Sequence, residues 1–175
     1  MDRRPARRRI AVAATATAVL AAGTFALGAG VAGADARSKG EKHAKPVTKA
    51  QVLGLFDNWN AALRTGDPKK VADLYARDAV LLPTVSNQVR TDRAGIVDYF
   101  EHFLQNKPVG TKVESVVNVL DRDTVIDTGV YEFALTDHET GEKSTVKARY
   151  TYAYEKQPNG KWLIVNHHSS KMPQG

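Results

Sequence analysis

Apolar residues between positions 48 and 108 recur at the three- and four-residue spacing of amphipathic helices. This spacing predicts a first helix that begins at the capping box Thr48-x-x-Gln51 and ends at Gly66. Asp67-Pro68 predicts a second helix, because Asp is a favoured cap and Pro a favoured first-turn residue. Thr91 or Asp92 caps a third. The expected buried stripes are Val52, Phe56, Trp59 and Leu63; Val71, Leu74 and Tyr75; and Ile96, Tyr99, Phe100, Phe103 and Leu104.

After residue 108 the hydrophobic period changes to two, which is typical of β-strands. Long strands are predicted over residues 112–120, 124–135, 144–156 and 161–169, and a short apolar strand over 79–82. The element order is therefore α-α-β-α-β-β-β-β. Strands that follow one another pair, and helices cover one face of a sheet. We expect an α+β fold in which a cone-shaped, curved antiparallel sheet packs against three helices.

The segment before the first helix has the pattern of an export signal. Five arginines within residues 3–9 precede an uncharged apolar stretch, and Ala34-Asp35-Ala36 offers a cleavage site. We therefore predict a signal peptide over 1–36, a polar linker over 37–47, a domain over 48–175 and a secreted protein without membrane contact after cleavage. An uncleaved membrane anchor is the alternative, because the apolar stretch is long enough to span a bilayer. The general and twin-arginine export routes both remain open.

Charge and composition narrow the classes of partner. The formal net charge is +6, but residues 51–175 hold 15 Lys and Arg against 16 Asp and Glu. The domain thus lacks the basic excess that a nucleic-acid binder needs, and no nucleic-acid partner is predicted. The chain has no cysteine, which excludes disulfides and thiolate metal sites. His, Asp and Glu show no clustered ligand spacing, so neither a metal nor a cofactor is expected.

Four segments resemble a known family. They read WNAALRTGDPKKVADLYARDAVLLP, GIVDYFEHFL, ARYTYAYEKQPNGKW and WLIVNHHSSKMP. Together they resemble the nuclear-transport-factor-2-like superfamily, and more closely the association domain of calcium/calmodulin-dependent protein kinase II and its SnoaL-like bacterial relatives. The last segment is the most specific, because its Trp strand ends in a His-Ser step. The resemblance implies a hub or pocket module without phosphoryl transfer. The superfamily also hosts isomerases, cyclases and dehydratases, so fold alone does not assign function.

The resemblance implies a pocket with arginines and places His168 near its mouth. His168 is then a hydrogen-bond donor or a general base in the pocket. The alternative is a structural histidine whose ring is hydrogen-bonded to the backbone at a strand end. The adjacent His167 faces the opposite side of a regular strand, and we expect it to be structural or at the surface. Arg149 is the candidate pocket cation, although the family's arginine position falls nearer Tyr152. Arg149 and His168 together suggest a small organic anion as ligand.

The remaining candidates are aromatic and acidic. Trp59, Tyr75 and Tyr99 either line an apolar cavity that binds a ligand or only form the core. An isomerase or cyclase needs a carboxylate on the cavity wall, and Asp127 is the best, though weak, candidate. His168 and Asp127 are accordingly the weak catalytic candidates, and whether the chain is an enzyme stays open.

Two functions follow from these patterns. The first is a binding and assembly module that forms a homodimer or larger ring, because helices on one face of a sheet leave the other face to be covered. Val117, Val119, Tyr150 and Tyr152 are candidates for that contact. The alternative is a small-molecule isomerase or cyclase of SnoaL-like type.

Overall fold

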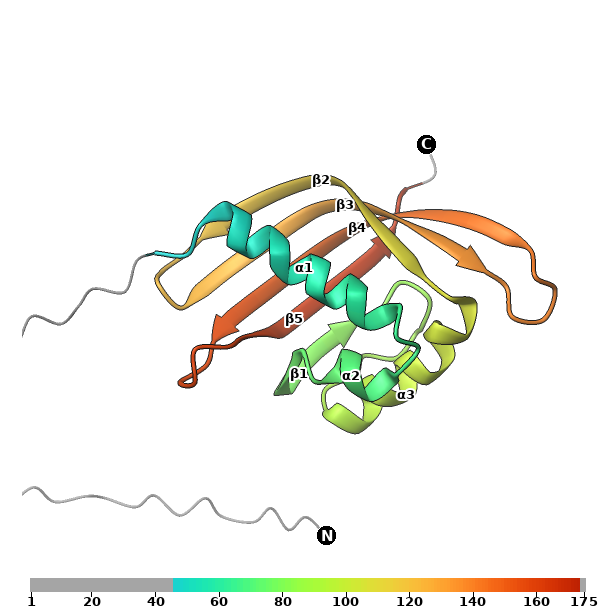
Figure 1. The fold of residues 1–175 in the computed structure, drawn as a ribbon, viewed down its shortest axis with the longest axis horizontal. Helices are drawn as coiled ribbons and strands as arrows, with labels where there is room; N and C mark the ends of the chain where they lie inside the picture. The colour runs from blue at the N-terminus through green and yellow to red at the C-terminus, as the bar shows by residue number, and fades with distance from the viewer. Residues whose placement is uncertain (1–45, 174–175) are drawn as a thin grey trace, which may run out of the picture. The chain divides into compact units, whose positions relative to one another are not determined.

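The computed structural model describes residues 46–173, so the predicted signal peptide and most of the linker lie outside the described residues. Figure 1 shows one curved sheet with the helices on its inner side. The elements are α1 (Lys49–Leu63), α2 (Pro68–Ala72), β1 (Tyr75–Leu82), α3 (Arg93–Phe103), the 3-10 turn η1 (Leu104–Asn106), β2 (Val109–Val119), β3 (Thr124–Thr136), β4 (Lys143–Lys156) and β5 (Trp162–Lys171). This order confirms the predicted one and adds only the short turn.

The helices begin at the caps that the sequence predicts. The Thr48 hydroxyl accepts from the Gln51 amide at 3.2 Å, and the Gln51 side chain accepts from the Thr48 amide at 2.8 Å. The Asp67 carboxylate accepts from the Lys69 amide at 2.9 Å, ahead of Pro68. At α3 the cap is Asp92 rather than Thr91. Each cap satisfies amides that otherwise lack a partner at a helix start.

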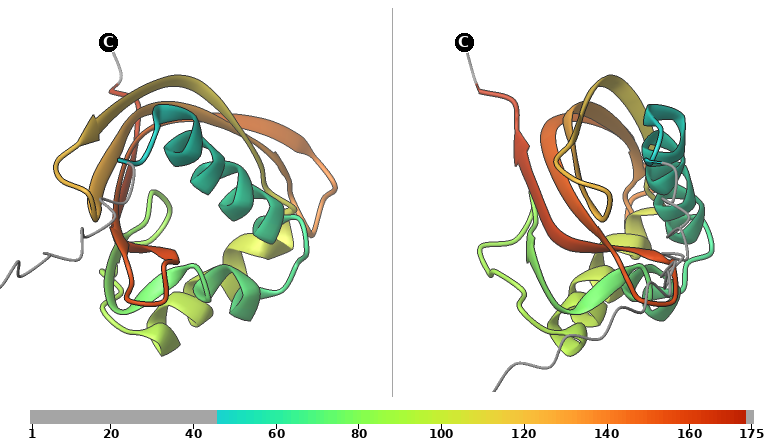
Figure 2. Two further views of the ribbon diagram at one scale, coloured as in Figure 1. Left: turned by 60° about the vertical axis from the view of Figure 1, so that its left-hand side comes forward. Right: turned by 90° about the vertical axis from the view of Figure 1, so that its left-hand side faces the viewer.

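The sheet has the strand order β1-β5-β4-β3-β2. The four long strands β2 to β5 pair antiparallel in sequence order, as predicted. β1 instead pairs parallel with β5, so the sheet is mixed rather than wholly antiparallel. Figure 2 shows the sheet curling around α1, while α2 and α3 lie beside β1. This is the cone-shaped α+β fold that the sequence predicts.

β1 is longer than the apolar run suggests. It starts at Tyr75, which we expected on the buried stripe of the second helix. That helix ends at Ala72, and the Leu74 carbonyl already accepts from the Ile164 amide of β5 at 2.9 Å. Tyr75 is still buried, because its side chain points into the core from the first strand residue. The extension places its hydroxyl beside β5.

The core lies between the helices and the inner face of the sheet. Tyr131, Tyr150, Tyr152 and Tyr154 form a ladder on this face and pack under Phe56 and Trp59 of α1. Tyr150 and Tyr152 are fully buried, so neither is available to a second copy of the chain. Val117, opposite Asp127 in the register, also faces inward. Naming these three as contact residues was therefore wrong.

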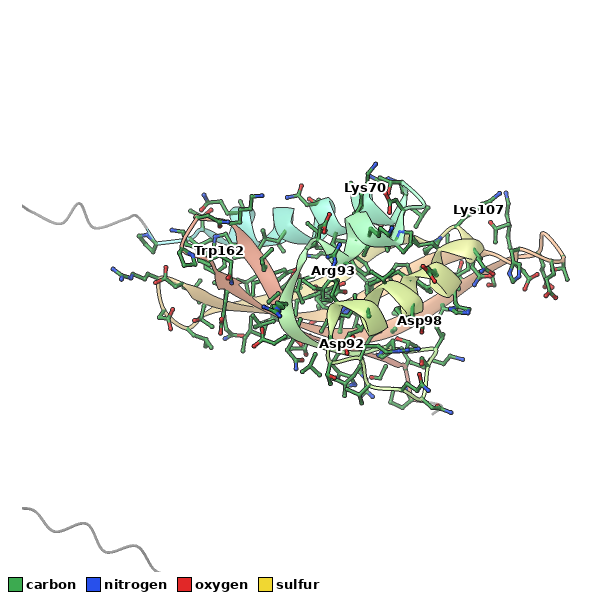
Figure 3. All side chains as sticks on the ribbon, turned by 90° about the horizontal axis from the view of Figure 1, so that it is seen from below. Lys70, Asp92, Arg93, Asp98, Lys107 and Trp162 are labelled. Atoms are coloured by element: carbon green, nitrogen blue, oxygen red, sulfur yellow. The ribbon has the colours of Figure 1, made fainter. Side chains whose placement is uncertain are left out.

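Charged contacts join α3 to its neighbouring segments at the surface. Arg93 at the start of α3, which Figure 3 labels, reaches the Asp73 carboxylate at 2.7 Å. Asp98 on the same helix binds Arg90 at 2.7 Å. Within residues 46–173, no helix is both long and apolar enough to cross a bilayer.

Candidate functional site

A small cavity lies between α3, the loop after β1 and the inner face of the sheet. Its volume is about 30 Å³, which is room for a water molecule or a ligand of a few atoms. Most of its lining is apolar and includes Trp59, Phe100 and Phe133. Its polar groups come from His167 and Ser169 of β5, from Tyr99 and Tyr131, and from Thr84. Among the described residues that line it, none is Arg, Lys, Asp or Glu.

His167 is the most distinctive group in this cavity. It is 3% exposed, and its ring stacks on Tyr152 with centroids 4.0 Å apart. The Trp59 indole donates to the Tyr75 hydroxyl at 3.1 Å, and that hydroxyl lies 2.9 Å from His167 Nδ1. The three side chains come from α1, β1 and β5. A hydrogen-bonded relay therefore fixes the ring from one side.

Burial decides the charge of His167. Desolvation lowers its pKa to about 3, with a smaller contribution from the neighbouring His168. The imidazole is therefore neutral at physiological pH and carries one proton. The indole N–H of Trp59 can only donate, so the Tyr75 oxygen accepts it. Among the described residues, His167 Nδ1 is the one acceptor within reach of the buried Tyr75 O–H, so this O–H donates to Nδ1. The single proton of His167 then sits on Nε2.

His168, which the resemblance placed at a pocket, points the other way. It is exposed and lies opposite Thr151 on the outer face of the sheet. The cause is an irregularity in β5: Ala153 pairs with Asn166 and Tyr154 with Ile164, so Val165 is an extra residue. One extra residue exchanges the faces of every side chain beyond it. His167 is thus inside and His168 outside, so the placement of His168 at the pocket was wrong, whereas His167 takes the structural of its two predicted roles.

Arg149 also lies outside the cone. It is exposed in β4, between Val130 of β3 and Ser170 of β5 in the register. The inner face of β4 is occupied by the tyrosine ladder, which begins at the next residue. The prediction that Arg149 and His168 project together into the cone is therefore wrong. Both border a shallow depression on the outer face instead.

Asp127 is buried but does not reach the cavity. It is 0% exposed, and its carboxylate binds Lys112 Nζ at 2.6 Å and the Ser115 hydroxyl at 2.5 Å. The Tyr150 hydroxyl adds a third contact at 3.2 Å. Lys112 in turn lies over the Phe56 ring, 4.8 Å from its centroid. The carboxylate is thus paired and fully hydrogen-bonded, which suits a structural ion pair beneath α1.

The three aromatic candidates take different places. Trp59 and Tyr99 line the cavity. Tyr75 does not line it but lies directly behind His167. Two residues beyond His167 on β5, Ser169 accepts from the Tyr131 hydroxyl at 2.5 Å and also bonds to Thr84. Within residues 46–173, no three His, Asp or Glu side chains gather into a possible metal site.

Comparison with known proteins identifies the family. The model of the calcium/calmodulin dependent protein kinase II association domain matches residues 48–173. The chain belongs to this family. A crystal structure described as such an association domain from Xanthomonas campestris is 57% identical, with a TM-score of 0.70, and the match covers 75% of this chain and 95% of that one. No functionally curated protein matches the chain.

More distant solved structures share the fold of this association domain. A ketosteroid isomerase-like protein from Erwinia carotovora atroseptica is 16% identical, with a TM-score of 0.60, and 71% of this chain and 96% of that one are covered. A nuclear transport factor 2-like protein from Salmonella enterica is 13% identical, with a TM-score of 0.63, over 71% and 91% of the two chains. These likenesses confirm the predicted cone-shaped fold.

Sequence reasoning missed the role of His167. Strict alternation from Ile164, which is buried, puts Asn166 and His168 inside. The sequence carries one hint of the opposite arrangement, because the apolar run Leu163-Ile164-Val165 does not itself alternate. The relay from Trp59 through Tyr75 joins residues 16 and 92 positions apart, and a local spacing rule does not detect such contacts.

Proposed function

We propose that this association domain is a non-catalytic, exported module that assembles with a second copy of itself through the outer face of its sheet. The observation that carries the proposal is the asymmetry of the sheet. Helices and the aromatic core cover its inner face, whereas its outer face has no cover from the described residues (Figure 2). A sheet of this kind commonly buries its second face against a partner.

The outer face presents side chains suited to a flat contact. Val116 of β2 is 49% exposed and lies beside Thr128 of β3, which lies beside Thr151 of β4. The two threonine hydroxyls are 3.0 Å apart and already hydrogen-bonded to each other. Short branched side chains of this type pack closely without exposing unpaired polar groups. Val113, on the same edge strand, is also exposed.

Charged residues on this face are arranged so that it matches itself. Glu114, Val130 and Arg149 share one register row across β2, β3 and β4. In a two-fold contact, residue i of one copy meets residue j of the other, and the reverse holds as well. An axis near Val130 brings Glu114 of each copy against Arg149 of its partner. We therefore assign Arg149 to assembly rather than to a pocket.

The non-catalytic part of the proposal rests on the cavity. Isomerases and cyclases need a carboxylate or another acid–base group at the reacting atoms. Asp127 is held by Lys112 away from the cavity, and His167 is a neutral base with a very low pKa. A small organic anion has little support at this cavity, because no cation stands among the described lining residues. These features favour binding and assembly over chemistry.

Light scattering of the purified protein tests the proposal. We expect the wild type to have at least twice the mass of one chain, and Val116→Asp to have the mass of one. Ala61→Asp is the matched control, because Ala61 is exposed on α1, on the helical side of the molecule. It should leave the assembly unchanged. A monomeric wild type, or equal masses for wild type and Val116→Asp, would contradict the proposal.

A further inference from the structure

One fully buried hydrogen-bond donor in the lining of the cavity has no partner among the described residues. His167 Nε2 is buried and has no hydrogen-bond partner within the described part of the chain. The other ring nitrogen is already committed to Tyr75. Buried donors of this kind are rare in folded proteins, and an unmade bond of a buried donor destabilises the fold. The group is therefore either satisfied by something in the cavity or is a persistent defect.

The relay behind the ring fixes Nε2 as a donor rather than an acceptor. Trp59 donates to Tyr75, Tyr75 donates to Nδ1, and the neutral ring carries its proton on Nε2. The polar groups around Ser169 are occupied by one another, since Tyr131 and Thr84 both bond to this serine. A molecule in the cavity thus meets the oriented N–H of His167 and the Tyr99 hydroxyl among aromatic and aliphatic walls.

We infer that this cavity binds a small uncharged molecule that has an apolar body and an oxygen that accepts a hydrogen bond from His167 Nε2. A ketone, an aldehyde or an amide has this chemistry. A carboxylate does not, because burying its charge requires a cation that the lining residues do not supply. The cavity volume of about 30 Å³ restricts the ligand to a few non-hydrogen atoms. The site is separate from the outer face and does not depend on assembly.

Three small molecules of nearly one shape test this inference. Acetone has the acceptor oxygen, isobutene replaces that oxygen with a methylene group, and acetate adds a charge. The experiment uses the full chain with ¹⁵N-labelled histidine and follows the ring nitrogens by nuclear magnetic resonance. Without ligand, His167 should show the pattern of a neutral ring protonated at Nε2. Acetone should then shift the Nε2 signal and saturate at millimolar concentration, as expected for four non-hydrogen atoms.

Substitutions separate the hydrogen bond from simple filling of space. His167→Phe keeps an aromatic ring but removes the donor, so the ratio of acetone to isobutene affinity should fall about tenfold. His168→Phe makes the same change on the outer face and should leave the ratio unchanged. If His167→Phe does not fold, the wild-type signals still decide. A proton on Nδ1, no saturable shift with acetone, acetate binding more tightly than acetone, or an unchanged affinity ratio would each overturn the inference.

Discussion

The hydroxyl of Tyr75 lies 2.9 Å from Nδ1 of His167 and joins the first residue of β1 to the middle of β5. The two strands pair parallel, and this contact lies on the inner side of that pairing. It orients a neutral imidazole at the cavity wall. Both the stability of the fold and the chemistry of the cavity therefore depend on the same ring.

The stability of the domain should fall between pH 7 and pH 5. An unfolded histidine binds a proton near pH 6.5, whereas burial holds the pKa of His167 at about 3. The unfolded state thus binds more protons in this window, and stability present at pH 7 is lost as the pH falls. The loss should be about 2 kcal/mol at pH 5. Urea denaturation at the two pH values measures it.

His167→Gln is the control for this pH effect. The groups that face His167 are Tyr75, Tyr152 and Trp59, and none of them titrates between pH 5 and 7 because burial raises the pKa of both tyrosines. The variant should therefore lose most of the difference between the two pH values. An equally steep difference in the variant would show that another group causes it.

The pair Lys112–Asp127 should be costly to break from one side. Lys112→Met leaves the fully buried Asp127 carboxylate without its cation, and the free energy of unfolding should drop by about 3 kcal/mol. Adding Asp127→Asn should recover most of this loss, because the charge is gone and Ser115 can still bond to the amide. Chemical denaturation checks both variants.

Lys147 of β4 is the matched control for Lys112, because it forms an ion pair at the surface rather than in the core. Lys147 lies 4.0 Å from Glu132 at the surface, and the two side chains are 48% and 41% exposed. Lys147→Met should therefore change stability by less than about 1 kcal/mol. If Lys147→Met and Lys112→Met cost the same amount, burial of the pair has no effect.

The pattern of the sequence was sufficient for the fold because its signals are local. The capping box at Thr48, the Asp67-Pro68 start and the alternating tyrosines of β4 each specify an element from a few neighbouring residues. Strands that follow one another then pair in order, and family resemblance agrees with the result. β1 was underestimated because its first residues, around Tyr75, gain their strand partners from β5, far along the chain.

The site was harder to predict because it depends on one inserted residue. Val165 shifts the register of β5, and this shift turns His167 inward and His168 outward. Alternation alone gives the opposite result. Arg149 lies on the face opposite the tyrosine ladder, and because that ladder fills the inner face, the arginine cannot serve the cavity.

Gly129 should be intolerant of a side chain. It lies opposite Ser115, next to the irregularity between Lys112 and Glu114 in β2, and an added Cβ would clash with the Glu114 carbonyl oxygen. Gly129→Ala should destabilise the domain by about 2–3 kcal/mol. Gly54→Ala in α1 meets no neighbouring atom and should instead stabilise by up to about 1 kcal/mol. Thermal unfolding of both variants compares them, and equal effects would refute the packing argument.

Export makes a separate prediction. Cleavage after Ala34-Asp35-Ala36 should give a mature protein that begins at Arg37. N-terminal sequencing of protein from the culture medium checks this. Membrane-associated protein that retains Met1 would instead identify the segment as an anchor.

Charge reversal across the outer face tests self-assembly most directly. Glu114 and Arg149 occupy one register row on either side of Val130, and the proposed two-fold contact sets Glu114 of one copy against Arg149 of the other. Glu114→Arg and Arg149→Glu should each weaken self-association at least about tenfold, because like charges then meet. The double variant restores opposite charges and should recover most of the wild-type affinity. Sedimentation equilibrium measures the self-association of all four proteins. Single variants that associate like the wild type, or a double variant that stays monomeric, would contradict assembly through the outer face of the sheet.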